Sequence, residues 1–331
     1  MKIKGKIALV TGAGGFIGSH LVEQLLDEGV RVKALLHYNS RNDLGNLIYL
    51  SEAQRSEIEI VFGDITDNAL IRSLIKGCDI VFHLAALIGI PYSYVAPYSY
   101  ANTNIHGSMN IFQACSDLGI EKLVHTSTSE SYGTAQYVPI DEKHPLQGQS
   151  PYAASKISAD FLAESYYRSF GLPVATIRPF NTFGPRQSRR AVIPTVLSQL
   201  LSGVKELHVG SLEPIRDFNY IKDTVKGFIA MAKCDASVGK LINIGSGHSI
   251  SIGDFIQLSL EKLGIQVEIK VDGNRVRPEK SEVVQLVCDN RLAAEILNWS
   301  PAYTFEQGLL ETIDFIKNNL STYYSLKGYI I

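Results

Sequence analysis

Short apolar runs alternate with amphipathic segments along the first half of the chain. The run KIALVTG, at residues 6–12, is apolar at nearly every central position, which is typical of a strand buried on both faces of a parallel sheet. The next segment places Ile17, Leu21 and Leu25 on one helical face, and Gly29 indicates where that helix ends. This alternation predicts an α/β protein whose helices cover both faces of a sheet.

The same pattern predicts six strands before residue 180 and a different organisation after it. The strands are expected at residues 6–12, 30–36, 57–64, 79–86, 122–128 and 173–179, with long helices at 99–118 and 152–170. We therefore expect a Rossmann-like doubly wound parallel sheet in residues 1–180 and a smaller C-terminal α/β lobe in residues 181–331. Part of 218–245 is expected to return to the first domain.

Composition and charge narrow the class of protein. Apolar residues make up 45% and charged residues 19% of 331 positions, as in an ordinary soluble globule, and the net charge of −2 indicates neither a nucleic-acid nor a membrane partner. No stretch approaches the ~18 apolar residues of a membrane helix, and the N-terminal apolar run is too short for a signal peptide. The four cysteines lie far apart, so we expect reduced thiols in a cytoplasmic protein, without a disulfide frame or a metal site.

A glycine-rich loop joins the first strand to the first helix. TGAGGFIGSH places Gly12, Gly15 and Gly18 where backbone amides can approach a pyrophosphate at a helix N-terminus. A simple turn is the other interpretation, but the strand–loop–helix context favours a dinucleotide.

The end of the second strand bears on which dinucleotide is bound. Leu36 stands where an NAD enzyme would be expected to carry an acid for the ribose, and His37, Ser40 and Arg41 follow it. These residues suit a 2′-phosphate and slightly favour NADP, although Arg41 facing water would leave the choice open. Asp64, after the third strand, either contacts the adenine or caps the next helix.

Tyr152 and Lys156 lie four residues apart and share one face of the helix predicted at 152–170. A free tyrosine has a pKa near ~10 and is a poor base at neutral pH. A lysine ammonium and an oxidised nicotinamide nearby would stabilise the phenolate and lower that pKa. A surface pair is the alternative, which the glycine loop upstream disfavours.

Taken together, these motifs resemble the extended short-chain dehydrogenase/reductase family, specifically its nucleotide-sugar 4,6-dehydratase branch. The resemblance covers nearly the whole chain and rests on TGAGGFIG, HLAA, STSESYG, YAASK, RPFNTFGPRQ, RDFNYIKD, NIGSG and RPEKSEV. It implies a tightly bound NAD(P)+ that is recycled in each turnover. The residues expected to bind this cofactor are Gly12, Gly15, Phe16, Ile17, Gly18, His37, Ser40, Arg41, Asp64, Ile65, Leu84, Ala85, Ala86, Tyr152 and Lys156.

Thr128, Ser129 and Glu130 look like the Thr-Ser-Glu segment of GDP-mannose 4,6-dehydratases, and the resemblance makes them catalytic together with Tyr152 and Lys156. In the implied cycle, the Tyr152 phenolate takes the carbon 4 hydroxyl proton as hydride leaves carbon 4 for the nicotinamide. Glu130 removes the carbon 5 proton, water leaves carbon 6 and hydride returns there. A solvated loop is the bland interpretation of Glu130.

The second half of the chain is expected to bind the substrate, a nucleotide sugar. The resemblance assigns this role to Asn181, Arg186, Val192, Arg216 and Arg277. The three arginines suit it because the guanidinium fork matches phosphate oxygens. Arg178 either joins them or braces the lobe. The aromatic segment 90–100 is expected to be a loop that walls the sugar pocket or packs in the core. The resemblance favours an N-acetylhexosamine, as UDP-GlcNAc or GDP-GlcNAc, over other sugars.

Three other functions stay open at this point. A UDP-glucuronate decarboxylase also carries Thr-Ser-Glu, whereas a UDP-sugar 4-epimerase would leave Glu130 without a role. A dinucleotide-sensing binding protein would be expected to lack Tyr152 or Lys156. The second long helix carries more apolar and aromatic surface than one sheet face needs, at Phe161, Leu162, Tyr166 and Tyr167. The resemblance implies a homodimer through this helix and the one at 99–118, and packing of these aromatic residues under the 90–100 loop is the alternative.

Overall fold

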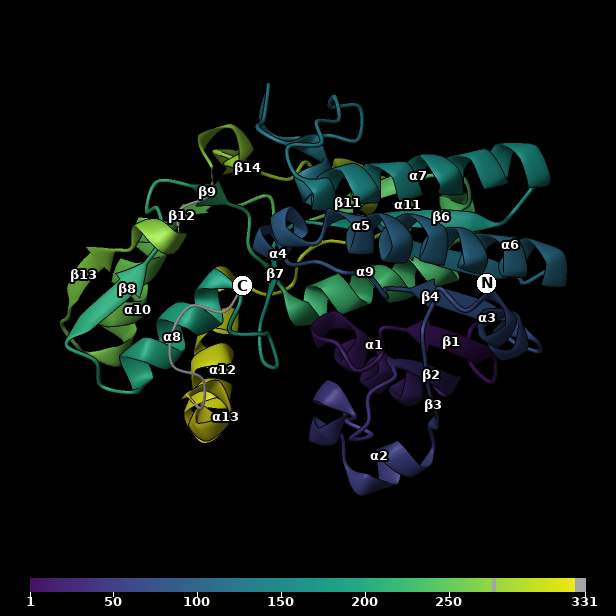
Figure 1. Cartoon of the computed structure of the whole chain (residues 1–331), viewed down its shortest axis with the longest axis horizontal. Coiled ribbons are helices and arrows are strands. Elements are labelled where there is room, and N and C mark those ends of the chain that lie inside the picture. The colour runs from purple at the N-terminus through teal and green to yellow at the C-terminus, as the bar shows by residue number, and fades with distance from the viewer. Residues whose placement is uncertain (276–277, 325–331) are drawn as a thin grey trace.

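The structure is a computed structural model that describes residues 1–275 and 278–324. In Figure 1 the large sheet and the helices that cover it lie at the right, and a smaller lobe lies at the left. The predicted residue Arg277 lies outside the described residues. Among those that are described, no helix combines the length and apolar character that crossing a membrane requires.

The large sheet has seven parallel strands in the order β11-β6-β5-β4-β1-β2-β3. Their bounds are β1 Ile7–Thr11, β2 Arg31–His37, β3 Glu59–Gly63, β4 Ile80–His83, β5 Lys122–Thr126, β6 Val174–Pro179 and β11 Leu241–Ile244. The chain runs from β1 out to the edge strand β3 and then returns to β4 on the other side of β1, so the switch point where ligands bind in such sheets lies between the carboxyl ends of β1 and β4. The Rossmann-like α/β fold predicted from the sequence is confirmed, with β11 added to the six strands expected before residue 180.

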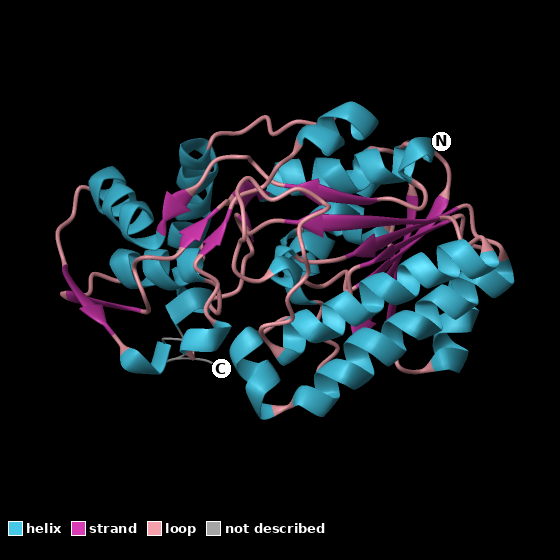
Figure 2. Cartoon of the chain, turned by 90° about the horizontal axis from the view of Figure 1, so that it is seen from above, coloured by secondary structure: helices cyan, strands magenta, loops and turns pink. Residues whose placement is uncertain are grey.

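Helices cover both faces of this sheet, as Figure 2 shows. Alternate strand residues enter different cores: Ala8 and Val10 pack in one cluster, whereas Leu9 packs in the other. The first face is covered by α1 (Phe16–Asp27), α9 (Ile221–Lys233) and α11 (Arg291–Leu297). The second is covered by α3 (Asn68–Ile75), α6 (Ser108–Leu118) and α7 (Pro151–Phe170).

The segment between β4 and α6 departs from the expected loop and single helix. It forms α4 (Ile90–Val95), α5 (Pro97–Tyr100) and a π-helix, η2 (Ala101–Gly107), which runs directly into α6. Helix packing explains the difference, because the aromatic segment 90–100 contacts α7 through both short helices. A π-helical turn often marks a functional position.

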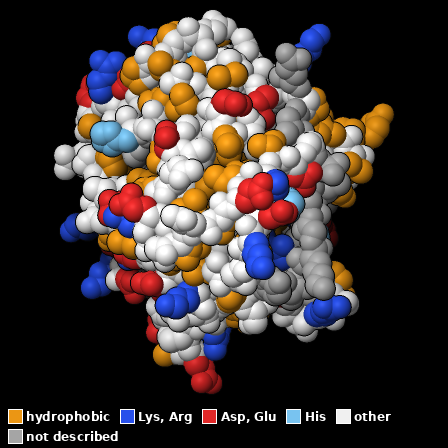
Figure 3. Space-filling model, turned by 90° about the vertical axis from the view of Figure 1, so that its left-hand side faces the viewer, with side chains coloured by type: hydrophobic (Ala, Val, Ile, Leu, Met, Phe, Trp, Pro, Cys, Tyr) orange, Lys and Arg blue, Asp and Glu red, His pale blue; other side chains and the backbone are white. Residues whose placement is uncertain are grey.

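In the part of the chain that the structure describes, the smaller lobe consists of short strands and α-helices. The strands are β7 (Thr182–Phe183) with β10 (Asn219–Tyr220), β8 (Glu206–Val209) with β13 (Glu268–Val271), and β9 (Ile215–Arg216) between β12 (Ile250–Ser251) and β14 (Gln285–Leu286). The helices are α8 (Val192–Leu201), α10 (Ile252–Leu263), α12 (Phe305–Asn318) and α13 (Leu320–Tyr324). The outer face of this lobe mixes acidic, basic and apolar side chains (Figure 3).

Candidate active site

The glycine loop between β1 and α1 is packed too tightly for side chains. Gly12 has a φ of +71°, and a Cβ there would lie 2.9 Å from the backbone nitrogen of Ala85. At Gly18 a Cβ would lie 2.2 Å from the carbonyl oxygen of Gly12. No side chain caps the N-terminus of α1, where Gly15 is the N-cap residue. The first amides of this helix are therefore available to a phosphate, so the loop fits a dinucleotide.

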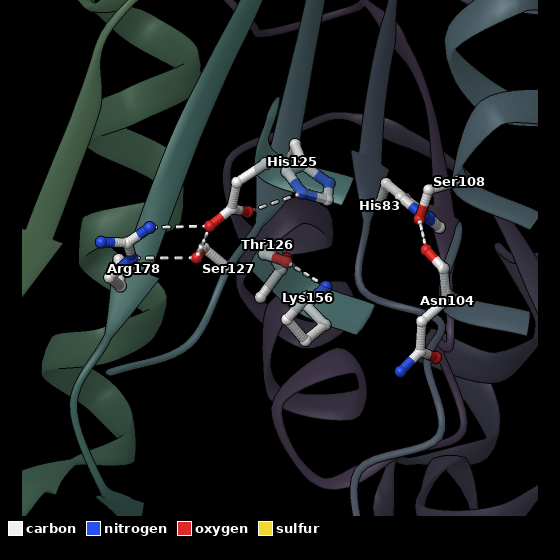
Figure 4. Close-up of polar contacts among 9 residues, drawn as sticks. His83, Asn104, Ser108, His125, Thr126, Ser127, Lys156 and Arg178 are labelled. Carbon is white, nitrogen blue, oxygen red and sulfur yellow. Dashed lines mark hydrogen bonds and ion pairs between the residues drawn. The ribbon is translucent and has the colours of Figure 1, made fainter. Parts of the chain in front are cut away.

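A buried hydrogen-bond chain fixes the segment that follows β4 against this loop. Thr11 Oγ1 accepts from the backbone N–H groups of Leu84 and Ala85, both at 3.1 Å. Thr11 also lies 2.9 Å from His83 Nδ1, and His83 Nε2 lies 3.0 Å from Ser108 Oγ. Since the Ser108 hydroxyl donates to the carbonyl of Asn104, it accepts from His83, and His83 accepts from Thr11. Figure 4 shows His83, Ser108 and Asn104 in this line.

The residues after β2 lie at the surface near Asp64. Leu36 is buried, whereas His37 is exposed with its Nδ1 3.6 Å from the Asp64 carboxylate. Ser40 and Arg41 are exposed as well. Ile65 is buried beside Gly107, Phe16 and Ile17 begin α1, and Ala86 follows the segment tied to Thr11.

Asp64 does not cap the next helix, so that interpretation is wrong. Its Oδ1 accepts from the backbone and the hydroxyl of Thr66, each at 2.8 Å, and closes a local turn. The cap of α3 is Asp67, which accepts from Leu70 N. This leaves the other Asp64 oxygen facing the exposed end of β2, next to His37.

Tyr152 and Lys156 are buried together on α7. Ser150 is the N-cap of this helix and Pro151 occupies its first turn, which fixes where the Tyr152 side chain begins. Lys156 Nζ donates to the carbonyl of Thr126 at 2.6 Å. Burial lowers the pKa of Lys156 to about 8, although the charge of Asp160 opposes that change.

The expected lowering of the Tyr152 pKa depends on a bound nicotinamide as well as on Lys156, and the side chains of the protein act on this pKa separately. Burial raises the pKa of Tyr152 above its ordinary value, and the charge of Glu130 raises it further. A hydrogen bond with Thr128 acts in the opposite direction. The chain alone therefore does not lower the tyrosine pKa, because desolvation of the phenolate outweighs its favourable contacts.

Glu130 lies in the short helix η3 (Ser129–Tyr132) directly after β5. Thr128 is its N-cap and accepts from Glu130 N at 3.3 Å. Ser129 and Ser131 are buried, and Ser131 Oγ has no hydrogen-bond partner among the described residues. Glu130 itself is half-buried and close enough for its charge to act on the Tyr152 hydroxyl. The structure thus brings Thr128, Glu130, Tyr152 and Lys156 together at the carboxyl end of β5.

A buried charged network, which the sequence analysis did not identify, lies next to this group (Figure 4). The Asp160 carboxylate accepts from Ser127 Oγ at 2.5 Å, from Arg178 Nη2 at 2.7 Å and from His125 Nε2 at 3.2 Å. Arg178 Nε also donates to Ser127 at 3.0 Å, and its guanidinium lies 4.5 Å from the centre of the Tyr132 ring. Arg178 therefore braces the site from within, and its exposed fraction is only 1%.

The helices after β4 form one wall beside Tyr152. The Tyr100 ring packs edge-on against the Tyr152 ring with centroids 6.3 Å apart, and its hydroxyl donates to Gly89 O at 2.5 Å. In the π-helix, Asn104 Nδ2 donates to Ser155 Oγ at 2.9 Å. This side-chain contact ties η2 to the catalytic helix, and no simple sequence signal marked it.

Two of the expected substrate residues lie at the boundary between the sheet and the lobe. Asn181 is half-buried, and its Oδ1 has no partner among the described residues. Arg216 lies in β9 with an exposed fraction of 6%, and its Nη2 is 3.3 Å from the Glu282 carboxylate. Val192 begins α8.

Arg186 has a structural partner in the sheet domain. Its Nη2 lies 2.8 Å from the Glu23 carboxylate on α1, and its guanidinium is 5.8 Å from the centre of the Tyr49 ring. Asn46 Nδ2 also donates to the Arg186 carbonyl at 3.1 Å. These contacts hold the loop after β7 against the helix that follows the glycine loop.

The described residues offer neither a cluster that could hold a metal ion nor a disulfide bond. Across residues 1–275 and 278–324, no group of three or more His, Cys, Asp or Glu side chains could hold a metal ion. The four cysteines are all free thiols.

The family model described as GDP-mannose 4,6 dehydratase matches residues 9–312 of this chain. The chain belongs to the GDP-mannose 4,6-dehydratase family. Within it, dTDP-glucose 4,6-dehydratase of Streptomyces antibioticus is 31% identical over 96% of this chain and 95% of its own length. UDP-glucuronate 4-epimerase of Thermodesulfobacterium geofontis is 32% identical over 96% of this chain and 98% of its own length.

Solved structures of dehydratases have the same fold. The structure of DesIV, a dTDP-glucose 4,6-dehydratase from Streptomyces venezuelae solved with NAD bound, superposes with a TM-score of 0.85 at 29% identity. The match covers 97% of this chain and all of that one. This GDP-mannose 4,6-dehydratase family member is thus an enzyme of the extended short-chain dehydrogenase/reductase type, with dehydratases and epimerases among its relatives.

Proposed function

We propose that this protein is a nucleotide-sugar 4,6-dehydratase that forms a 4-keto-6-deoxy sugar nucleotide. The observation that carries the proposal is the position of Glu130 beside Tyr152, close enough for its charge to raise the tyrosine pKa. A carboxylate there can act on the carbon next to the one whose hydroxyl contacts the tyrosine. Elimination of water needs such a base, whereas exchange of configuration at carbon 4 alone does not.

The cofactor in this proposal is NAD(P)+, held by the glycine loop, the segment 84–86 and the residues after β2. The fit rests on the tight Gly12 turn and on the uncapped N-terminus of α1. Bound there, the nicotinamide would supply the two-electron oxidation and the later reduction of the sugar. The buried Leu36 and the exposed Arg41 keep the slight preference for NADP, although DesIV was solved with NAD.

Tyr152 and Thr128 act on the carbon 4 hydroxyl. The phenolate oxygen of Tyr152 accepts the proton of this hydroxyl while Thr128 holds the same oxygen by a hydrogen bond. Lys156, anchored on the Thr126 carbonyl, supplies the positive charge that the phenolate needs in this buried position. A positive nicotinamide ring bound nearby would add to that charge and would favour the phenolate further.

Glu130 acts at carbons 5 and 6. Once carbon 4 is a ketone, the carbon 5 proton is acidic, and the Glu130 carboxylate removes it. The protonated Glu130 then gives its proton to the carbon 6 hydroxyl, which departs as water. The carboxylate is restored. Reduction of the resulting 5,6-ene at carbon 6 would use the hydride held on the nicotinamide, and carbon 5 then takes a proton from solvent. Tyr152 releases the carbon 4 hydroxyl proton and returns to its phenolate form. Ser129 supports the same short helix from its buried side.

The substrate we propose is UDP-GlcNAc or GDP-GlcNAc, bound mainly by residues 181–331. Asn181, with its unpartnered Oδ1, and Arg216 are the best placed for the sugar diphosphate. Arg277 and Val192 stay in the proposed set, while the ion pair with Glu23 gives Arg186 a role in joining the lobe to α1. In this division residues 1–180 bind the dinucleotide, and part of 218–245, with β11 in the large sheet, belongs with them.

The proposed assembly is a homodimer through α6 and α7. Phe161, Tyr167 and Phe170 on α7 and Met109 on α6 are exposed apolar side chains on the outer surface of these helices. Tyr166, by contrast, is buried against Phe112. We further propose a cytoplasmic location.

A nucleotide-sugar 4-epimerase is the second candidate, because an epimerase is among the 32% identical relatives. A UDP-glucuronate decarboxylase is the third. Incubation with a panel of UDP-, GDP- and dTDP-sugars, followed by mass spectrometry, tests the three. A dehydratase product has lost one water, a decarboxylase product has lost carbon dioxide and an epimerase product keeps the substrate mass. Only the first outcome supports the proposal.

A further inference from the structure

The face of α7 that carries Tyr152 and Lys156 also carries Asp160, one turn further on. This face aligns with four consecutive residues at the end of β5. Tyr152 contacts Thr128, Lys156 donates to Thr126 O, and Asp160 accepts from Ser127 and His125. Tyr152, Lys156 and Asp160 are spaced four residues apart, so they lie on one face of α7 and contact the same short segment of chain.

Charges in this buried region do not balance without Asp160. Lys156 and Arg178 are both nearly fully buried cations, with exposed fractions of 4% and 1%. His83 and His125 are neutral there, because burial lowers the pKa of both imidazoles and the Lys156 charge lowers it further. Two carboxylates lie near these cations among the described residues, Asp160 on α7 and the half-buried Glu130 in η3, and the charge of Asp160 raises the pKa of Lys156.

Asp160 itself is held in its ionised form. Burial alone would raise the pKa of this carboxyl, but the hydrogen bond from His125 and the charges of Arg178 and Lys156 outweigh it and hold the pKa well below its usual range. The carboxylate is 7% exposed and accepts three hydrogen bonds. A buried carboxylate with this many donors is stable only where its charge has partners.

We propose that Asp160 is a positioning residue of the active site, which ties residues 125–128 to α7 and supplies the counter-charge that keeps Lys156 protonated. The charge of Asp160 favours the Lys156 ammonium that the Tyr152 phenolate needs, although the charges of Asp160 and Glu130 both raise the pKa of Tyr152 itself. The inference rests on the proposed function only for the roles of Tyr152 and Lys156.

The test is a direct titration of Lys156 in holoenzyme labelled with ¹³Cε-lysine. The Lys156 resonance is identified as the one missing from Lys156→Arg. In the wild type we expect its midpoint near about 8, and a midpoint clearly below neutrality would overturn the proposal. In Asp160→Asn the midpoint should fall by about 1 pH unit, since an opposite charge within a few ångströms favours the charged form.

Two further variants separate charge from structure. Glu164→Gln removes a negative charge from the exposed side of the same helix, where Glu164 pairs with Arg168, and should leave the Lys156 midpoint unchanged. Arg178→Gln removes the cation that lowers the Lys156 pKa, so its midpoint should rise. An unchanged midpoint in Asp160→Asn overturns the proposal. If Asp160→Asn does not fold, the wild-type titration decides, and a midpoint clearly below neutrality overturns the proposal, while Arg178→Gln measures only the effect of Arg178.

Activity gives a second readout. The alkaline limb of the kcat/KM profile should move to lower pH in Asp160→Asn, whereas a purely structural role would lower kcat at every pH without moving that limb. The Lys156 titration needs no substrate, so failure to find a dehydratase reaction would leave the proposed role of Asp160 standing. If the protein is an active dehydratase and the Lys156 midpoint does not shift in Asp160→Asn, the role of Asp160 is wrong and the proposed function stands.

Discussion

The Lys156 ammonium donates a 2.6 Å hydrogen bond to the backbone carbonyl of Thr126, two residues before the Thr128 that contacts Tyr152. The last residue of β5 thus positions Lys156 through its backbone carbonyl, and Thr128, just after the strand, positions Tyr152 through its side chain. The same segment continues into η3 and carries Glu130. The oxidation at carbon 4 and the elimination at carbon 5 are therefore served from one short stretch of chain, and changes at its two ends should have different consequences.

Replacing Tyr152 by Phe should abolish the first oxidation, because Tyr152 is the group that accepts the carbon 4 hydroxyl proton in the proposed cycle. Thr128 is a hydrogen-bond partner and not a base, so it cannot take over this role. Glu130→Gln, which keeps Tyr152, should still oxidise carbon 4 and accumulate reduced nicotinamide. Transient absorbance of the reduced cofactor after mixing with substrate distinguishes the two variants. Equal accumulation in both would mean that Tyr152 is not the first base.

Acid stability should depend on Asp160. Its pKa is depressed in the folded protein, so the carboxylate contributes stability above the unfolded value of about 4 and loses that contribution as the pH falls below it. The urea midpoint of the wild type should therefore drop as the pH falls below about 4, and that of Asp160→Asn should drop less steeply. Glu164→Gln serves as the control, and a slope for Asp160→Asn as steep as the wild-type slope would contradict the assignment.

Arg41 should affect NADP binding more than NAD binding. The guanidinium is exposed beyond the end of β2 and suits a 2′-phosphate, which NAD lacks. Calorimetric titration of Arg41→Ala with each dinucleotide should reveal a selective loss for NADP. Arg31→Ala, at the exposed start of the same strand, is the matched control. An equal loss for both dinucleotides would show that Arg41 does not recognise the phosphate.

The proposed homodimer should be disrupted by Phe161→Glu. Phe161 is 57% exposed on α7, and a charge there would be buried without a partner in an interface of over ~1,000 Å². Light scattering at micromolar concentration should give a dimer mass for the wild type and a monomer mass for the variant. Val271→Glu, on an exposed strand of the lobe, should remain dimeric. A wild-type monomer would end the proposal.

The sequence indicated the parts of the site that depend on local spacing. The glycine loop, the Tyr152–Lys156 pair and the Thr128–Glu130 segment each lie within a few residues of chain. The Asp160–Arg178 pair joins α7 to β6, and only the packing of helix on sheet brings these side chains together. Asp160 lies four residues after Lys156, so helical periodicity is enough to place both on the same face of α7. The residues that Asp160 contacts lie in or next to β5 and β6, and their spacing along the chain does not predict these contacts.

Other differences have the same physical origin. The aromatic segment 90–100 is predicted to be a loop, yet it forms two short helices. Pro91 and Pro97 each stand in the first turn of one of them, where the missing N–H of proline is harmless. Asn104 in the π-helical turn contacts Ser155 on another helix, and a contact of this kind between distant segments cannot be predicted from local spacing. The direction of the Tyr152 pKa shift depends on burial, which the motif alone does not report.

The mass of the product formed in deuterium oxide tests the central claim most directly. With its nucleotide-sugar substrate, the wild type should yield a product that has lost one water and gained deuterium at carbon 5, where Glu130 removes the proton. Glu130→Gln, which keeps the shape of the side chain but not its basicity, should form this product at least ~100-fold more slowly. A product of unchanged mass without deuterium at carbon 5, or near-normal turnover by Glu130→Gln, would contradict the account.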